Sequence, residues 1–328
     1  MSPVKYFVAG GSGFVGRHLL LRLLADGHVV RALVWSEEAA RVVAALGAAP
    51  VRGDLTGLTG RGDELWGVGV VVHAEANESG RSDAAHVALT RDLLDAARAA
   101  GVRRFVHVSS DAVLDDGRPV RYVDETAPYP ARHRGEHART MALAEQTVLA
   151  SDSREMRTVA LRPRLVWGPG DTVLPRIIAA AQRGRWGWAH GGSHLTSTCH
   201  VRNLCEGIVL ASRRGRGGQA YFLTDGPPVE LRDFVARCAE AYGVELPDRT
   251  VPYPVTRTAA SVMDTGWRVL PLKGEPPAAA VSLGVHEVTV DDTRARTELR
   301  YVPVVGVDEG IAELAEERSA AGETGGGS

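Results

Sequence analysis

The chain has little cysteine, little lysine, few aromatic side chains and almost no net charge. Its three cysteines form no Cys-x-x-Cys pair, so a disulfide framework is not expected. Its 38 basic residues against 40 acidic ones argue against a dedicated nucleic-acid-binding protein. No apolar run is long enough to cross a bilayer, so we expect no membrane span. The first residues enter a strand pattern without signal-peptide features, which favours a cytoplasmic location.

Hydrophobic residues make up 44% of the 328 residues, enough for a substantial core and roughly two domains. Short apolar runs alternate with amphipathic stretches: strands are expected at 5–9, 29–34, 50–52, 68–73, 104–108, 158–161 and 220–223, and helices at 14–25, 37–46, 84–100, 136–151, 174–183, 201–212 and 231–242. This alternation predicts an α/β fold with a Rossmann-type doubly wound parallel sheet. We expect a Rossmann domain over residues 1–168, a smaller interleaved substrate-binding lobe over 169–315 and a flexible tail over 316–328.

A glycine-rich turn separates the first expected strand from the first expected helix. It places Gly10, Gly13 and Gly16 at a spacing of three residues. Glycine lets the backbone approach a pyrophosphate closely, and the start of a helix supplies N–H groups and a positive dipole. This context predicts a dinucleotide site, which Phe14 and Val15 of the same turn also line.

Several segments, in this order, resemble the extended short-chain dehydrogenase/reductase superfamily: GGSGFVGRHL (10–19), VRGDL (51–55), VVHA (71–74), RFVHVSS (104–110), LRPRLVWGPG (161–170) and STCHVRNLCEGI (197–208). The branches that they resemble most are the NAD-dependent epimerase/dehydratase and 3-beta-hydroxysteroid dehydrogenase-like proteins. The resemblance implies that the first domain binds NAD or NADP, with the glycines on the pyrophosphate and Asp54 at the adenine. It implies the same cofactor surface for Leu55, His73, Ala74 and Pro163.

The choice between NAD and NADP is open at the sequence level. Relatives that prefer NAD carry an acidic residue at the end of the second strand, where it binds the ribose hydroxyl. Here that strand ends at Trp35, and the next acidic residue is Glu37. Relatives that prefer NADP often have arginine at the position of Trp35, which offers stacking area for adenine but no charge.

The resemblance also implies a catalytic hydroxyl after the fifth strand and a Tyr-x-x-x-Lys pair on the next helix. Ser110 fits the hydroxyl. The helix reads HARTMALAEQ over 137–146, where relatives read Y-x-R-[ST]-K-x-x-x-E, so His137 stands at the tyrosine and Met141 at the lysine. The only lysines, Lys5 and Lys273, have no tyrosine four positions before them, so the pair is absent from the whole chain.

The two replacements are chemically consistent with each other. Tyrosine, with a reference pKa near 10, needs a nearby cation to exchange protons at neutral pH, whereas imidazole titrates near 6.5 without help. Methionine removes the charge that would repel an imidazolium. His137 and Met141 lie at positions i and i+4, on one helix face. We therefore expect His137 to act as an acid/base or hydrogen-bond donor. The alternative is a site that has lost its activity, in which neither residue has a catalytic role.

Other departures from the family pattern fall in the same neighbourhood. Asp111 follows Ser110 where a small or apolar residue is usual, Glu75 stands in a run that is usually apolar, and His86 replaces an asparagine. We expect Ser110, Asp111, Glu75 and His86 to approach one pocket with His137. The histidines between 190 and 200 do not converge convincingly, so no metal is expected.

Three functions remain open. The first is an NAD(P)-dependent oxidoreductase acting on a carbonyl or hydroxyl carbon of a hydrophobic or sugar-like small molecule. The second is a non-redox isomerase, cyclase, epimerase or dehydratase on the same fold, with His137 moving protons. The third is a catalytically inactive NAD(P)-binding regulator. Each involves a small molecule rather than a nucleic acid or a membrane, and each is compatible with a homodimer.

Overall fold

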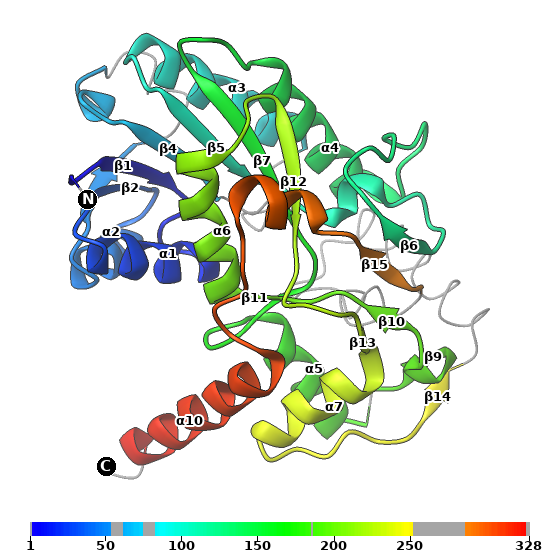
Figure 1. Cartoon of the computed structure of the whole chain (residues 1–328). Coiled ribbons are helices and arrows are strands. Elements are labelled where there is room, and N and C mark those ends of the chain that lie inside the picture. Colours follow the sequence, from blue (N-terminus) through cyan, green and yellow to red (C-terminus); the bar gives the residue numbers. More distant parts are fainter. Residues whose placement is uncertain (1, 54–61, 75–82, 185, 252–285, 326–328) are drawn as a thin grey trace.

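The computed structural model describes residues 2–53, 62–74, 83–184, 186–251 and 286–325 (Figure 1). A central sheet with helices on both faces occupies one part of the molecule, and a lobe with its own small sheet packs beside it (Figure 1). In the part of the chain that is described, no helix is long and apolar enough to cross a membrane.

The central sheet has seven strands in the order β12-β7-β5-β4-β1-β2-β3, and all neighbours are parallel. Their bounds are Lys5–Ala9 for β1, Val29–Val34 for β2, Ala49–Arg52 for β3, Val70–His73 for β4, Arg104–Val108 for β5, Arg157–Pro163 for β7 and Gln219–Leu223 for β12. The winding direction changes between β1 and β4, which opens a crevice at the carboxyl ends of those strands. The predicted α/β, Rossmann-type doubly wound sheet is confirmed.

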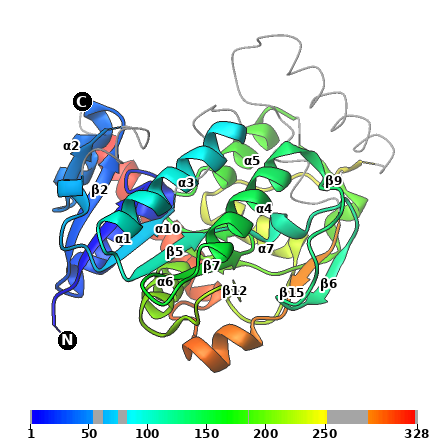
Figure 2. The ribbon, with the colours of Figure 1, turned by 90° about the horizontal axis from the view of Figure 1, so that it is seen from above.

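Side chains alternate between the two faces of the sheet, because successive residues of a strand point in opposite directions. On β1, Tyr6 and Val8 belong to a core shared with α1, α2 and α6, whereas Phe7 and Ala9 belong to a second core under α3 and the end of α4. Figure 2 shows α3 and α4 side by side. These helices span Phe14–Ala25 (α1), Glu37–Ala45 (α2), Asp83–Ala99 (α3), Gly135–Ala150 (α4) and Val201–Arg214 (α6).

The second lobe is built mostly from residues after 165. Its sheet has the order β13-β10-β15-β6, with bounds Val229–Glu230, Leu195–Thr196, Val288–Val290 and Val120–Val123. Short pairs join β8 (Val166–Trp167) to β11 (Cys199–His200) and β9 (Trp188–Ala189) to β14 (Thr250–Val251). Helices α5 (Val173–Gln182), α7 (Leu231–Ala241) and α10 (Val307–Gly325) cover an apolar core that includes Trp167, Trp186 and Phe234.

Two features bear on the expected domain limits. Strand β12 comes from beyond residue 169 yet completes the central sheet, so the two parts interleave. Residues 316–325, expected to belong to a flexible tail, instead continue α10, because Leu314 is fully buried and Glu317 accepts a hydrogen bond from Tyr242 at 3.0 Å. The boundary at residue 168 stays a prediction.

Candidate cofactor and catalytic site

The glycine-rich turn leads directly from β1 into α1. Gly10 has a left-handed φ of 89°, and its carbonyl accepts a hydrogen bond from the Gly13 N–H at 3.1 Å. Among the described residues no side chain caps α1 at Gly13, and its first turn carries no acidic residue. The N–H groups and the positive end of the helix dipole therefore face outward, as an anion requires.

The glycines of this turn have different tasks. A Cβ at Gly16 would lie 2.0 Å from the Gly10 carbonyl oxygen, and one at Gly11 would lie 2.6 Å from the Cβ of Ala32. Those two glycines let the turn pack on its own helix and on β2. A Cβ at Gly13 would meet only the Gly10 oxygen, at 3.4 Å, and Gly13 is exposed. The turn thus leaves its open side at Gly13, which fits the pyrophosphate of a dinucleotide.

The other residues expected to bind the cofactor have different surroundings, and some lie outside the described residues. Trp35 is half-buried and packs on the core that contains Phe7. The N–H of Ala74 donates to the Ala9 carbonyl at 2.9 Å, beside the crevice, and Pro163 is buried at the end of β7. Asp54, Leu55 and Glu75 lie outside the described residues. The expected roles of all these residues stay predictions.

His73 lies in the layer between the sheet and α3, where its ring contacts Phe105 and His86. It is 1% exposed, its Nδ1 lies 3.1 Å from Nδ1 of His107 on β5, and its ring stacks on His86 at 5.8 Å. Burial lowers the pKa of both hydrogen-bonded imidazoles: that of His107 falls to about 4, and that of His73 falls well below its ordinary value. One nitrogen of the pair must donate and the other accept, so the pair is stable only while an imidazole is neutral.

This buried pair predicts loss of stability in mild acid. As pH falls from the unfolded value near 6.5 to about 4, the unfolded chain binds protons that the folded His107 does not. The free energy of unfolding should then fall by about 1.4 kcal/mol per pH unit for each such histidine. Urea unfolding at about pH 7.5 and about pH 5 measures this difference, which should shrink in His107→Gln. An unchanged difference in that variant would contradict the assignment.

Ser110 and Asp111 leave β5 at the carboxyl end of the sheet, beside the end of β7. The Ser110 hydroxyl accepts from the Ala112 N–H at 3.1 Å and donates to Asp111 Oδ1 at 3.2 Å. Asp111 Oδ2 lies 3.4 Å from Nη1 of Arg164, which follows Pro163. Burial raises the pKa of Asp111, and the Arg164 charge and the Ser110 hydrogen bond oppose that rise. The structure therefore brings together a hydroxyl, a carboxylate and a guanidinium.

His137 and Met141 occupy the first two turns of α4 but differ in burial. His137 is exposed in the first turn, whereas Met141 is 5% exposed within an apolar cluster that includes Val113, Leu114 and Phe222. Met141 thus packs α4 on the short helix η3 (Asp111–Leu114), which carries Asp111. His137 and Met141 are one helical turn apart, as expected, but they have different surroundings. His137 is exposed and can contact a ligand, whereas Met141 is buried and packs its helix against η3.

A buried ion pair sets the position of α4 on the sheet. Glu145 of α4 accepts from Arg162 of β7 at 2.7–3.1 Å and from the Tyr129 hydroxyl at 2.5 Å. Both members of the ion pair are almost fully buried, and the guanidinium also lies over the Tyr129 ring at 5.4 Å. Breaking such a pair leaves an uncompensated buried charge, so the register of α4 is strongly defined.

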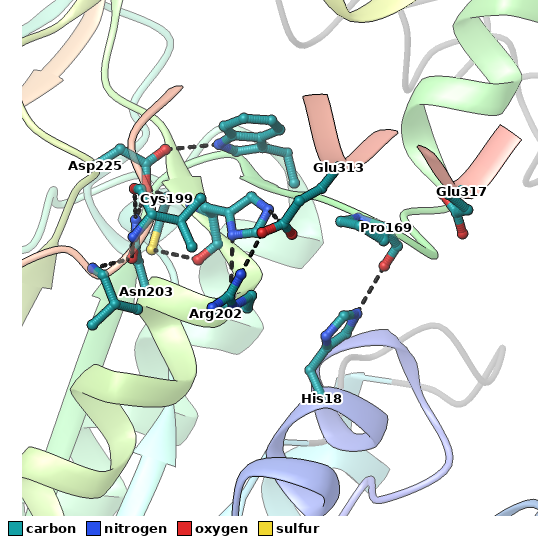
Figure 3. Close-up of polar contacts among 12 residues, drawn as sticks. His18, Pro169, Cys199, Arg202, Asn203, Asp225, Glu313 and Glu317 are labelled. Carbon is teal, nitrogen blue, oxygen red and sulfur yellow. Dashed lines mark hydrogen bonds and ion pairs between the residues drawn. The ribbon is translucent and has the colours of Figure 1, made fainter. Parts of the chain in front are cut away.

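The Gly168-Pro169-Gly170 turn lies against the start of α1 and on a polar hub centred on Asp225 (Figure 3). His18 of α1 donates from Nε2 to the Pro169 carbonyl at 2.8 Å.

Asp225 accepts from the side chains of Trp167, Thr198 and Asn203 at 2.7–2.8 Å and from the His200 N–H at 2.5 Å. Burial raises the pKa of Asp225, and these donors oppose the rise. The hub thereby joins β8, β11, α6 and the end of β12.

Sequence reasoning missed Arg164, His18 and Asp225. Arg164 directly follows Pro163 in a segment that was recognised, so its position at the carboxyl end of β7 was an available signal. His18 lies in the first helix after the glycines, where it reads as an ordinary helix residue. Asp225 belongs to no motif; only the fold brings its donors together.

Comparisons with known proteins agree with this architecture. The model of the 3-beta hydroxysteroid dehydrogenase/isomerase family matches residues 7–255. A 4-hydroxy-2-methyl-3-oxo-4-farnesyl-3,4-dihydroquinoline-1-oxide ketoreductase from Stigmatella aurantiaca is 46% identical, covering 95% of this chain and 96% of its own. A 2-alkyl-3-oxoalkanoate reductase from Stenotrophomonas maltophilia is 32% identical, covering 95% and 98%. A decarboxylating sterol-4-alpha-carboxylate 3-dehydrogenase from Dictyostelium discoideum is 30% identical, covering 94% and 99%.

Among solved structures, MoeE5 in complex with UDP-glucuronic acid and NAD has a TM-score of 0.71 at 26% identity, covering 97% of this chain and 99% of that one. The overall fold is thus shared with a solved structure that covers almost the whole chain. The chain belongs to the 3-beta hydroxysteroid dehydrogenase/isomerase family of the extended short-chain dehydrogenase/reductase enzymes.

Proposed function

We propose that this protein is an NAD(P)-dependent oxidoreductase that interconverts a ketone and a secondary alcohol in a largely apolar small molecule. The observation that carries the proposal is the 46% identity to a ketoreductase over nearly the full length of both chains. The open glycine turn at Gly13 supports dinucleotide binding. The nicotinamide, when bound, supplies or accepts a hydride.

The names of the three relatives support a narrower substrate class. Each names an oxo or hydroxyl carbon at position 3: in the alkanoate and the sterol, a carboxylate is attached to the adjacent carbon. In the quinoline 1-oxide, the N–O group is attached to the adjacent carbon 2. In every case an oxygen with a full or formal negative charge is bonded to the second atom from the reacting carbon. We infer that the substrate of this protein is a 3-oxo or 3-hydroxy compound of this kind.

The protein's own residues would handle the oxygen and its proton. Ser110, at the end of β5, presents a hydroxyl that can hydrogen-bond the substrate oxygen. His137, exposed in the first turn of α4, would give a proton to that oxygen during reduction and remove it during oxidation. Asp111 and Met141 would act indirectly, Asp111 by holding Arg164 and Met141 by packing the helix that carries His137.

Turnover with a 2-alkyl-3-oxoalkanoate tests the proposal. With NADH or NADPH in the cuvette, we expect loss of nicotinamide absorbance and formation of the 3-hydroxy product in equal amounts. A different product, at the same oxidation level as the substrate and formed without net change in the cofactor, would support the non-redox function instead. Cofactor binding without any turnover, over a panel of 3-oxo acids and cyclic 3-ketones, would support the regulator.

A further inference from the structure

Arg164 has unused hydrogen-bonding capacity beside the catalytic hydroxyl. Its Nη1 lies 3.4 Å from Asp111 Oδ2 and its Nε lies 3.3 Å from Thr196 Oγ1, both at the long end of the hydrogen-bond range. Among the described residues nothing accepts from its Nη2. Arg162, two residues earlier and within β7, instead contacts both oxygens of Glu145 at 2.7–3.1 Å. Arg164 is therefore held in place without being saturated.

The backbone directly after Arg164 forms a tight turn. Leu165, the next residue, has a left-handed φ of 45°, which is rare for a residue other than glycine. The turn is held on one side by the last residue of β7 and on the other by the Cys199 N–H, which donates to the Leu165 carbonyl at 3.2 Å. Backbone strain of this kind persists where surrounding structure maintains it, and it gathers at ligand sites.

Position and charge together define what Arg164 can bind. It stands at the carboxyl end of β7, next to Ser110 at the end of β5, and it reaches Thr196 of the second lobe. Its side chain is 14% exposed, so water screens its charge only partly. A guanidinium presents parallel N–H groups that match the two oxygens of a carboxylate.

We propose that Arg164 is the specificity-determining residue that binds the negatively charged oxygen of the substrate while the reacting oxygen lies at Ser110. This rests on the proposed function and adds the residue that selects its substrate class. Asp111 keeps the guanidinium aimed and balances its charge while no substrate is bound. Thr196 holds Nε and Asp111 holds Nη1, which leaves Nη2 for the ligand.

The test compares a 2-alkyl-3-hydroxyalkanoate with its methyl ester, which carries one additional methyl group and no charge. Binding is measured by calorimetry on protein loaded with NAD+ or NADP+, and oxidation of both probes is followed in parallel. The protein should bind the acid roughly 10- to 100-fold more tightly than the ester, since a charge-assisted contact is lost in the ester. Arg164→Met should remove this preference by lowering the affinity for the acid and not for the ester. Arg164→Lys should keep part of the preference.

Two further variants separate recognition from structure. Arg164→Met with Asp111→Asn removes the guanidinium without leaving a buried carboxylate unpaired, and should also bind both probes equally. Arg216→Met removes an exposed arginine that pairs with Glu298 at the opposite end of β12, and should retain the preference.

Equal binding of acid and ester by the unaltered protein would overturn the proposal. So would a preference for the acid that persists in Arg164→Met, or a loss of affinity in that variant that is equal for acid and ester. Failure of the proposed function gives a different result. A charge preference that depends on Arg164 but is accompanied by no oxidation supports the anion site and refutes the oxidoreductase. Oxidation of acid and ester at equal efficiency supports the oxidoreductase and refutes the anion site.

Discussion

Gly13→Val is expected to abolish dinucleotide binding while the protein remains folded. Gly13 has extended backbone angles, φ −74° and ψ 176°, which valine adopts readily. The new side chain would project into the open side of the turn, over the N–H groups of the first turn of α1. Losing two charge-assisted hydrogen bonds to a phosphate costs about 3–6 kcal/mol, which weakens binding by roughly 100-fold or more. Titration of nicotinamide fluorescence measures the loss.

Gly16→Ala is the matched control for this variant. Its Cβ would lie 2.0 Å from the Gly10 carbonyl oxygen, so the turn itself must shift. This substitution should destabilise the fold by about 1–3 kcal/mol or more, whereas Gly13→Val should change the melting temperature little. Saturable nicotinamide binding by Gly13→Val at unaltered affinity would refute the site.

The central sheet was predictable because its signals are local. The expected ranges 5–9, 14–25, 29–34 and 104–108 coincide with β1, α1, β2 and β5. In each, an apolar run or an amphipathic helix pattern ends at a glycine or a polar residue within a few positions. Parallel strands buried on both faces produce the clearest such runs. The glycine turn is local as well, since β1, the turn and the start of α1 are continuous in sequence.

The second lobe was harder to predict because its strands are short and their partners are distant. Strand β15, for example, is three residues long and pairs with β6 more than 160 positions earlier. Helix α10 was mistaken in part for a tail, since a glycine-rich end gives no sign of tertiary contacts. A Cβ on its Gly310 would lie 2.6 Å from Trp167, which shows how closely it docks.

In the candidate site, too, some residues were predictable from local sequence and others depend on tertiary contacts. Ser110, Asp111 and His137 follow from motif positions on one strand end and one helix. The burial of Met141 and the pairing of His73 with His107 do not, because both depend on which face of an element meets its neighbour. Arg164 was within a recognised segment, but its importance comes from Asp111 and Thr196, which lie 53 and 32 residues away in sequence.

His137→Ala is expected to lower the turnover rate by on the order of 10²- to 10⁴-fold if the imidazole is the acid/base. Binding of NAD(P) should be unaffected, because His137 is exposed on α4 and the glycine turn lies on α1. Glu136→Gln is the matched control: it changes a half-buried residue in the same helical turn that pairs with Arg139, and the rate should stay within about twofold. A His137→Ala variant with the unaltered rate would refute the role.

The paired substitution His137→Tyr with Met141→Lys separates redox from non-redox chemistry. A lysine at 141 would run its apolar stem through the cluster of Val113 and Leu114, and helical side chains lean toward the N-terminus, so its ammonium would emerge near residue 137. There it would lower the pKa of a tyrosine, because a nearby cation favours the phenolate. An oxidoreductase should recover much of the activity that His137→Ala loses. An enzyme that needs the imidazole for a non-redox proton transfer should not recover, and Met141→Lys alone should impair either one by placing a cation beside His137.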